Sequence, residues 1–499
     1  MAMPNNQTIY EIGSVTKTFT SLLLAEAILE HKIKLEDDIR KYLKGNYPNL
    51  AYKGRPIRLL HLANLTSGLP NNLPEKMPPL KTLGADSQLF EIRNFHDSYT
   101  KAQFLKDLHA VKLRQEPGLN PAHSNTAAQL LGYLLENVYG STYQELLAKY
   151  ITVPFKMTST YVSVPVSKKT FYVPGYNDKG ILMPDIPKDA AGAGILKSSL
   201  PDMLAYLKNQ MSEQDKRIVL SHKPTWGEVG NMVIGLNWNI KTNFDDRRKL
   251  WVSGGTFGQS CYLCMYPERK FAVVILSNES DGGAEDRLSG LAQAIYNELY
   301  FTAAQQSSEG FGFSASINSL LDSLNEHGFD NAIRVADSLK NRNPSFKLYE
   351  DELNNWGYYY FFKNQKAKAL EIFKLNVSLY PQSANTYDSL AETYEELGNK
   401  VEAIENYKQE LKLSPGNKEI AEHVKKIEKE YVDEHDSLPV LQLSPTRIIV
   451  TIPTKARRPE SYLSNNYIPH PHFLPTSLSN NPYLFTFTFL KQLPKKVTR

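Results

Sequence analysis

A 34-residue period in the second half of the chain constrains the fold more than any other sequence feature. Aromatic, small and proline residues recur at this spacing, in the pairs Tyr360/Tyr394, Ala369/Ala403, Phe373/Tyr407 and Pro381/Pro415. The small residues let paired helices approach closely, and each proline follows the end of a helix. A repeat of this length cannot bury its apolar face alone, so the period predicts a stack of helix pairs.

The period and its residue types resemble the tetratricopeptide repeat. Its matching cores are Trp356–Tyr360 (WGYYY) and Leu390–Tyr394 (LAETY). An earlier, degenerate copy is indicated by Ala332 and Pro344, which have the spacing of the small residue and the proline in the later copies. Three helix pairs are about the minimum for a stable stack. We therefore expect an all-α tetratricopeptide solenoid over residues 315–435, acting either as a structural appendage or as a concave surface that binds a protein partner.

A second feature lies at the start of the chain, where Glu11–Thr20 (EIGSVTKTFT) opens a long apolar run that ends near Leu29. Ser14 and Lys17 stand three residues apart, which places both side chains on one face of a helix. A serine hydroxyl is a poor nucleophile until a base takes its proton, and a lysine can be that base if burial keeps it partly neutral. Gly13 lets the backbone turn tightly into the helix, which leaves the Ser14 amide free to face an oxyanion. The spacing alone is weak evidence, because both residues are common and an isolated match more often lies on a solvated helix face.

A turn-rich loop, Gln115–Asn125 (QEPGLNPAHSN), directly precedes an apolar helix predicted over Thr126–Val138. A loop placed before a helix can aim polar side chains into a site, and the candidates here are His123, Ser124 and Asn125. The structural alternative is a helix cap formed by Ser124 or Asn125, with His123 merely exposed.

Two β-rich runs within Trp251–Asn278 are joined by a Pro-Glu-Arg-Lys turn, which predicts a hairpin. Ser253–Thr256 (SGGT) leads into it, and glycines at a strand edge allow a ligand or a second backbone to approach, although a bulge would need them as well. Cys261 and Cys264 lie three apart in one run, so their side chains should point to opposite faces. That placement suits neither a metal nor a disulfide and predicts two core cysteines.

Together these stretches resemble the serine β-lactamase and penicillin-binding-protein superfamily, in its class C, DD-peptidase-like branch, which also contains esterases. Ser14–Lys17 is similar to the Ser-x-x-Lys motif. His123–Asn125 stands where the branch has Tyr-x-Asn, and Val252–Gly254 stands where it has Lys-Thr-Gly or His-x-Gly. Two further segments, Leu65–Leu69 and Ala191–Ser198, also resemble the family.

The resemblance runs over about residues 8–300 and implies an α+β, β-lactamase/transpeptidase-like domain over residues 1–302. Such a domain has an antiparallel sheet flanked by helices. The family normally places two strands ahead of its Ser-x-x-Lys motif, and the thirteen residues before Ser14 cannot hold both. We therefore expect these N-terminal strands to be missing and the sheet to show a bare edge.

The resemblance also implies catalytic roles. Ser14 would be the acylated nucleophile and Lys17 its proton acceptor, while Asn125 would bind the substrate amide and hold Lys17 in place. His123 replaces a tyrosine, and an imidazole that titrates near ~6.5 can still relay a proton at neutral pH.

The third motif departs further from the family. Ser253 and Gly254 are the expected substrate-binding residues there, and the amides of Ser14 and Gly255 would form an oxyanion hole worth roughly 3 kcal/mol per donor. Val252 replaces a cation whose role is to receive a substrate carboxylate. Penicillins and D-Ala-D-Ala peptides are therefore disfavoured, whereas an ester without a carboxylate suffers less.

The net charge of +4 over 499 residues implies neither a nucleic-acid partner nor a membrane surface. No stretch has the roughly 18 apolar residues of a membrane span, and the N-terminus carries no secretory signal. As written, the chain is expected to be cytoplasmic, whereas the resembled family is typically periplasmic or secreted. Because His470 and His472 have no third ligand nearby, no metal or other cofactor is expected.

The last part of the chain, residues 436–499, has a different character. From Pro439 to Arg499 it holds eight Lys/Arg against one Asp/Glu, and Pro, Ser, Asn and aromatic residues recur there without a period. This composition predicts an irregular or disordered basic tail. A β-prone run within it, Tyr483–Leu490, could aggregate or pair with a sheet edge.

The residues therefore favour a β-lactamase-related serine hydrolase (peptidase, esterase or amidase) that cleaves a small-molecule or peptide substrate through a Ser14 acyl-enzyme. The alternative is a catalytically impaired relative that acts as a binding or scaffold protein through its repeats. Val252, His123 and the missing strands support that alternative.

Overall fold

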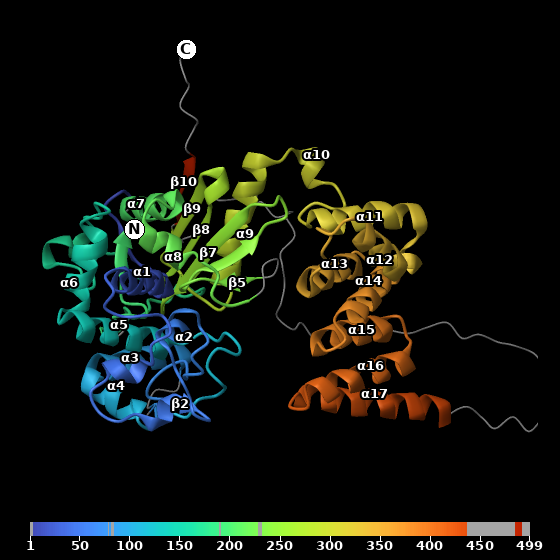
Figure 1. Cartoon of the computed structure of the whole chain (residues 1–499), viewed down its shortest axis with the longest axis horizontal. Coiled ribbons are helices and arrows are strands. Elements are labelled where there is room, and N and C mark those ends of the chain that lie inside the picture. The colour runs from blue at the N-terminus through green and yellow to red at the C-terminus, as the bar shows by residue number, and fades with distance from the viewer. Residues whose placement is uncertain are drawn as a thin grey trace, which may run out of the picture. The chain divides into compact units, whose positions relative to one another are not determined.

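The computed structural model describes residues 3–77, 79–80, 84–188, 191–227, 232–436 and 485–491. The described residues divide into two units (Figure 1). The sheet unit comprises those up to Gln306 together with strand β10 (Phe485–Lys491), and the helical unit comprises those from Ser307 to the end of helix α17.

The sheet unit is built on an antiparallel sheet of six strands among the described residues, in the order β10-β9-β8-β7-β6-β5. Its other strands are β5 (Val233–Ile234), β6 (Asn239–Thr242), β7 (Arg248–Gly255), β8 (Ser260–Tyr266) and β9 (Phe271–Ser277). Strands β8 and β9 pair in register from Ser260↔Ser277 to Tyr266↔Phe271, which confirms the predicted hairpin. Every residue of both strands is buried, which explains their nearly continuous apolar sequence.

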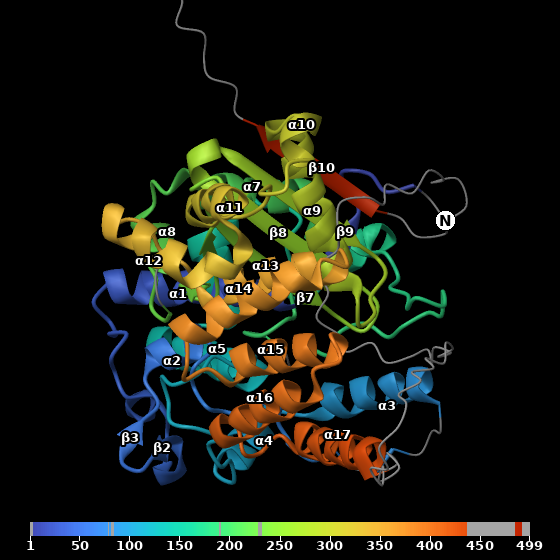
Figure 2. The ribbon, with the colours of Figure 1, turned by 90° about the vertical axis from the view of Figure 1, so that its right-hand side faces the viewer.

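Helices cover both faces of the sheet. Helix α9 (Ala284–Tyr300) lies against one face (Figure 2) and shares an apolar core with Cys264. Helix α1 (Thr16–Leu29) shares the larger core on the other face with Cys261. Both cysteines are free and buried, so the prediction of two core cysteines on opposite faces is confirmed.

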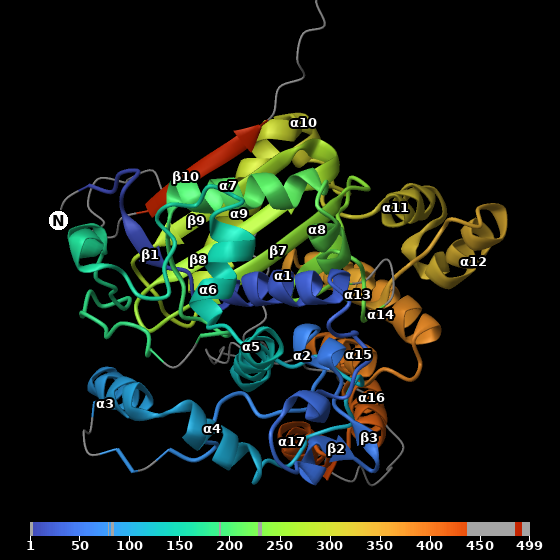
Figure 3. The same ribbon diagram turned by 60° about the vertical axis from the view of Figure 1, so that its left-hand side comes forward.

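The outer edge of β9, expected to be bare, carries a strand from the far end of the chain. Strand β10 pairs antiparallel with β9 over its whole length, from Phe485↔Ser277 to Lys491↔Phe271 (Figure 3). The β-prone run of the tail therefore pairs with a sheet edge, as one of its two expected behaviours. The rest of the predicted tail, residues 437–484 and 492–499, lies outside the described residues.

The sheet unit contains further helices and two short pairs of strands. The helices are α2 (Leu59–Ala63), α3 (Ala85–Ser98), α4 (Lys101–Leu108), α5 (Asn125–Tyr139), α6 (Tyr143–Leu147), α7 (Leu200–Ser212), α8 (Lys216–Ser221) and α10 (Ala303–Gln306). Two short pairs of strands complete it, β1 (Ile9–Glu11) with β4 (Lys197–Ser199) and β2 (Ala51–Tyr52) with β3 (Arg55–Pro56). Helix α3 lies in a stretch whose Pro- and Asn-rich sequence reads as irregular. None of the residues of α3 is fully buried, so its sequence lacks the strong apolar stripe that would predict a helix.

The helical unit consists of helices that pack on two apolar clusters. They are α11 (Ala315–His327), α12 (Ala332–Arg342), α13 (Glu350–Phe362), α14 (Lys366–Leu379), α15 (Ala384–Glu396), α16 (Lys400–Leu413) and α17 (Lys418–Asp436). The residues related by the 34-residue period are buried: Tyr360, Ala369 and Phe373 lie in one cluster, and Ala403 and Tyr407 in the other. The period therefore marks the interior of this unit.

Among the residues that the structure describes, no helix combines the length and the apolar character needed to cross a membrane.

Candidate active site

Ser14 lies in a single turn of 3-10 helix, Gly13–Val15, directly before α1. Gly13 has a φ of +49°, and a Cβ built on it would lie 2.6 Å from the carbonyl oxygen of Gly255. Only glycine satisfies both constraints without strain. The predicted tight turn at Gly13 is confirmed, and it sets the half-buried Ser14 beside the end of β7.

Lys17 follows on the first turn of α1, with only 3% of its surface exposed. Its Nζ donates to Ser14 Oγ at 2.7 Å, to Asn125 Oδ1 at 2.8 Å and to the carbonyl oxygen of Ala193 at 2.9 Å. Burial lowers the pKa of Lys17 to about 7, because desolvation disfavours the charged amine. A large share of Lys17 is therefore neutral near pH 7 and able to accept a proton.

His123 and Asn125 reach the same place from the loop before α5. His123 Nε2 lies 3.3 Å from Ser14 Oγ, on an imidazole that is exposed to solvent. Desolvation by the surrounding protein and then the charge of Lys17 lower the pKa of His123 to about 4. Because the shift is downward, the imidazole is neutral at pH 7.

The residue between them, Ser124, has the structural role that the sequence left open. Its Oγ accepts a hydrogen bond from the Ala127 amide at 3.0 Å and so caps α5. The same hydroxyl donates to the carbonyl oxygen of Pro70 at 2.7 Å. In this motif, Ser124 caps α5, while His123 contacts Ser14 and Asn125 contacts Lys17.

Two residues of the site were not predicted from the sequence. Asn71 Oδ1 lies 2.9 Å from His123 Nδ1, and Asn72 Oδ1 accepts from Asn125 Nδ2 at 2.9 Å. Both follow the Gly68-Leu69-Pro70 turn, and asparagine is so common beside turns that its type gives no signal.

The predicted glycine edge of β7 is packed against the turn that carries the nucleophile. A Cβ built on Gly254 would overlap the carbonyl oxygen of Ile12 and lie 3.0 Å from the Ser14 amide nitrogen. The sequence left open whether a ligand or a second backbone approaches these glycines, and at Gly254 it is a second backbone. Glycine is required because the two main chains touch.

The other two residues of this third motif lie on opposite faces of β7. Val252 is only 7% exposed and belongs to the core on the α1 side. Ser253, predicted to bind substrate, donates its hydroxyl hydrogen to the Glu285 carboxylate of α9. The motif therefore presents neither a cation nor a free hydroxyl for a substrate carboxylate.

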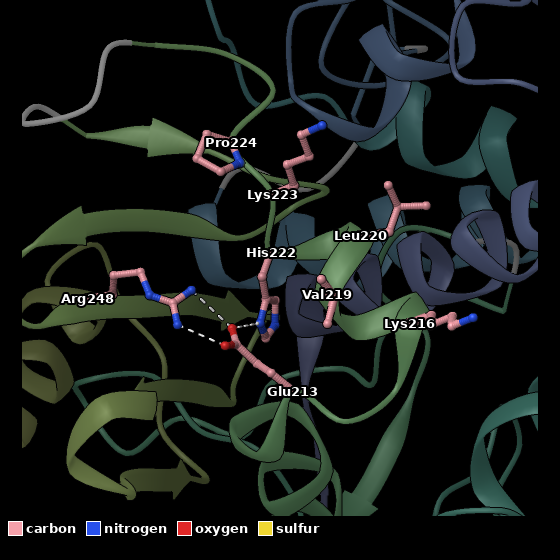
Figure 4. A pocket seen from close by; sticks show the side chains of 8 residues that line it. All are labelled: Glu213, Lys216, Val219, Leu220, His222, Lys223, Pro224 and Arg248. Carbon is pink, nitrogen blue, oxygen red and sulfur yellow. Dashed lines mark hydrogen bonds and ion pairs between the residues drawn. The ribbon is translucent and has the colours of Figure 1, made fainter.

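A surface pocket with a volume of about 420 Å³ lies elsewhere in the sheet unit. It is lined by Glu213, Lys216, Val219, Leu220, His222, Lys223, Pro224 and Arg248 (Figure 4). The guanidinium of Arg248 is held by two carboxylates, Glu213 and Glu268. Neither Ser14 nor Lys17 nor His123 lines this pocket. In the described part of the chain, no group of three or more His, Cys, Asp or Glu side chains is placed to hold a metal ion.

The residues predicted for the site thus come together, apart from Ser253. The Ser14 hydroxyl lies 2.7 Å from a buried amine and 3.3 Å from a neutral imidazole. This is the arrangement of a serine-hydrolase centre. The sequence profile of the beta-lactamase family matches residues 3–297, more than half of the chain. The chain belongs to the beta-lactamase family.

Two relatives of known class, a β-lactamase and a carboxypeptidase/endopeptidase, agree with this assignment. A β-lactamase of Escherichia coli (strain K12) is 26% identical over 314 residues, which cover 55% of this chain and 76% of that protein. The D-alanyl-D-alanine-carboxypeptidase/endopeptidase AmpH of the same strain is 26% identical over 295 residues, covering 56% and 72%. A crystal structure of a β-lactamase/D-alanine carboxypeptidase from Yersinia pestis has 25% identity, covers 59% of this chain and 85% of that one, and gives a TM-score of 0.49. The prediction of a β-lactamase-related serine hydrolase is confirmed at the level of the class.

Proposed function

We propose that this protein hydrolyses an ester or amide through an acyl-enzyme on Ser14, with Lys17 as the base. One observation carries the proposal: the Lys17 amine is buried, 2.7 Å from Ser14 Oγ, and has a pKa lowered to about 7. An ammonium with an ordinary pKa could not take the hydroxyl proton at neutral pH, whereas this amine is partly neutral.

In the acylation step, Lys17 Nζ takes the proton of Ser14 as Oγ forms a bond to the substrate carbonyl carbon. The bond from that carbon to the leaving group then breaks, and the leaving group receives the proton from Lys17. In deacylation, water loses a proton to the site and its oxygen bonds to the acyl carbon. The bond to Oγ breaks, Oγ regains a proton and the acid leaves.

Two backbone amides are suited to the oxyanion. The Ser14 amide lies at the N-terminal end of α1, beside the Gly254–Gly255 edge. We assign the Ser14 and Gly255 amides as its donors, with each contributing roughly 3 kcal/mol of transition-state stabilisation. Asn125 contacts Lys17 through its oxygen and would meet the substrate amide from the same side.

The third motif indicates the class of substrate. Val252 offers no charge, and the Ser253 hydroxyl is already held by the negatively charged Glu285. A substrate carboxylate placed beside Val252 would meet an apolar residue and no cation, because Ser253 and Glu285 lie on the other face of β7. We therefore propose substrates that are neutral at this position, with simple esters favoured over penicillins.

Covalent labelling tests the proposal directly. The full chain is incubated with a fluorophosphonate, which carries no carboxylate, and separately with a fluorescent penicillin, and intact mass and peptide mapping follow. We expect a single fluorophosphonate adduct on Ser14, none in Ser14→Ala, and much slower labelling by the penicillin. A folded sample whose Ser14 stays unmodified by both reagents contradicts the proposal and favours the catalytically impaired scaffold.

We propose in addition that residues 315–435 form a tetratricopeptide solenoid that binds a protein partner. Supporting this, a Cβ on Gly357 would lie 2.5 Å from the ring of Phe373, so the small residue lets α13 and α14 approach as the repeat requires. Ala391 holds the same position 34 residues later and is fully buried. Equal recovery of every partner by the full chain and by a chain without residues 315–435 contradicts the binding role.

A further inference from the structure

Asn71 is fixed by its main chain beside the start of α5. The Thr126 amide donates to the Asn71 carbonyl oxygen at 3.0 Å, and Thr126 Oγ1 donates to the same oxygen at 3.3 Å. The neighbouring Pro70 carbonyl accepts from Ser124 at 2.7 Å. Because three hydrogen bonds hold this segment to the helix that follows His123, the Asn71 side chain and the imidazole are positioned together.

The contact between Asn71 and His123 selects one form of the imidazole. A neutral imidazole carries a single N–H, on either Nδ1 or Nε2. His123 Nδ1 lies 2.9 Å from Asn71 Oδ1, and an amide oxygen only accepts, so the hydrogen is on Nδ1. Nε2 then presents a lone pair, 3.3 Å from Ser14 Oγ.

Access to solvent separates the tasks of the two nitrogen bases. Lys17 is 3% exposed and surrounded by three acceptors, so an incoming water cannot reach its amine easily. His123 is an exposed residue, and its Nε2 lies 3.3 Å from Ser14 Oγ. Water that attacks an acyl group on Ser14 therefore meets the imidazole.

We propose that Asn71 is a positioning residue, which holds His123 in the Nδ1–H tautomer so that Nε2 accepts the proton of the deacylating water. This proposal rests on the Ser14 acyl-enzyme proposed above. The water proton passes to Nε2 as the water oxygen bonds to the acyl carbon; the bond from that carbon to Ser14 Oγ breaks, and the imidazolium returns the proton to Oγ. Asn72 orients Asn125 in the same way. It accepts a hydrogen bond from Asn125 Nδ2, so that Asn125 Oδ1 faces Lys17.

The amide of Asn71 orients the imidazole without adding a charge beside it. The charged group that faces His123 is Lys17, which opposes protonation of the imidazole. A carboxylate at position 71 would stabilise the imidazolium and retain the proton that Ser14 must regain. Asparagine orients the ring without adding charge.

Nitrogen NMR of the histidine-labelled full chain tests the tautomer without any turnover. The chain has 11 histidines, and the signal lost in His123→Phe identifies the ring. We expect the Nδ1–H tautomer in the wild type, a shift toward Nε2–H in Asn71→Leu, and in Asn71→Asp an imidazole pKa higher than in the wild type. An Nε2–H imidazole in the wild type, or a tautomer unchanged in Asn71→Leu, overturns the proposal.

Kinetics on an ester substrate test the consequence. In Asn71→Leu we expect deacylation to slow by at least about tenfold, part of the 10²–10⁴ that a general base contributes, so that acyl-Ser14 accumulates while acylation changes little. A purely structural role would lower both steps and the Tm together, and that result also overturns the proposal. Asn46→Leu, at an exposed asparagine outside the site, is the matched control. If the wild type forms no acyl-enzyme at all, the proposed function fails, whereas the tautomer measurement still decides the role of Asn71.

Discussion

The two units of this protein differ in the sequence range of their internal contacts. In the helical unit, buried residues recur every 34 positions, and each helix packs mainly on its neighbours in sequence, as α13 does on α14 and α15 on α16. In the sheet unit, the site joins residues far apart in the chain: Ser14 meets His123 across 109 residues, and the edge that packs on Gly13 comes from β7.

The difference shows where a substitution should act. In a unit whose helices pack mainly on their neighbours in sequence, a change in one helix affects mainly those neighbours. A site assembled from distant segments depends on their mutual placement, so a small displacement at one contact lowers the reaction rate. The predictions below test this contrast, beginning with the largest effect.

The largest effect is expected from Lys17→Arg in the sheet unit. Arginine stays protonated at every accessible pH, so it cannot take the Ser14 proton. We expect labelling of Ser14 by a fluorophosphonate to slow by about 10²–10⁴, the usual contribution of a general base. In the wild type, the labelling rate should rise with pH through about 7, because only the neutral form of Lys17 accepts a proton. Lys216→Arg, on an exposed lysine, should label normally, and a flat wild-type profile between pH 6 and 8 would count against Lys17 as the base.

A pair of glycine substitutions compares the two units directly. In Gly254→Ala, the new Cβ overlaps the backbone of Ile12, which cannot move without displacing Ser14, and we expect labelling to slow by about 10². In Gly357→Ala, the new Cβ meets the buried ring of Phe373, which is a side chain and not a main chain. Residue 357 lies in the helical unit, so we expect normal labelling and a loss of stability of about 1–3 kcal/mol, the usual cost of an added methyl group in a packed core. Far-UV circular dichroism and thermal unfolding check the fold of both, and wild-type labelling of Gly254→Ala would show that the two backbones can separate harmlessly.

A smaller effect is expected from Val252→Lys, which supplies the cation that the third motif lacks. The measured quantity is the ratio of labelling rates, fluorescent penicillin over fluorophosphonate, because general damage to the site cancels in it. We expect this ratio to rise about tenfold, as one charge-assisted hydrogen bond of about 1.5 kcal/mol implies. Val252→Met adds bulk without charge and should leave the ratio unchanged. If the two variants behave alike, the missing cation does not limit penicillin reactivity.

The smallest effect concerns the pH dependence of the helical unit. Burial, followed by repulsion from nearby carboxylates, raises the pKa of Asp388 to about 6 and that of Glu410 to about 7. The folded unit thus retains protons that the unfolded chain has lost, so this stabilisation is present below about pH 4 and is lost as the pH rises through 6 to 7. Calorimetry should show a Tm that is higher at pH 5 than at pH 8, with most of the difference absent in Asp388→Asn.

The exposed Glu402→Gln is the control for this titration and should keep the wild-type difference. A Tm that rises between pH 5 and 8 would contradict the assignment of raised pKa values to Asp388 and Glu410. Labelling of Ser14 should be the same in all three proteins, because the substituted carboxylates lie in the other unit.

How far the sequence predicted each element depends on the range of the contacts that create it. The Gly13 turn, the β8–β9 hairpin and the opposite faces of Cys261 and Cys264 follow from spacing within a few residues, and all three are found. Helix α3 was missed because its side chains are not fully buried, so no strong periodic stripe marks it.

The site divides in the same way. The Ser14–Lys17 pair could be predicted from helical spacing, and His123 and Asn125 from their motif. The contact of Asn71 with His123 could not, because it spans 52 residues and depends on how the Pro70–Asn72 segment packs on α5. Nor could the sequence show that the Ser253 hydroxyl is held by Glu285, since a strand's alternation leaves open which face is the site.

By itself, then, the sequence determined the helical periodicity of residues 315–435 and the turn at Gly13. It also determined which residue types could form an acyl-enzyme, a serine followed three residues later by a lysine. Only the tertiary structure decided that a buried amine, a solvent-exposed imidazole and a glycine edge meet at one hydroxyl, and that β10 covers the edge of β9. The physical reason is that the pKa of Lys17, the tautomer of His123 and the pairing of a strand edge depend on desolvation and on partners that the chain brings together from a distance.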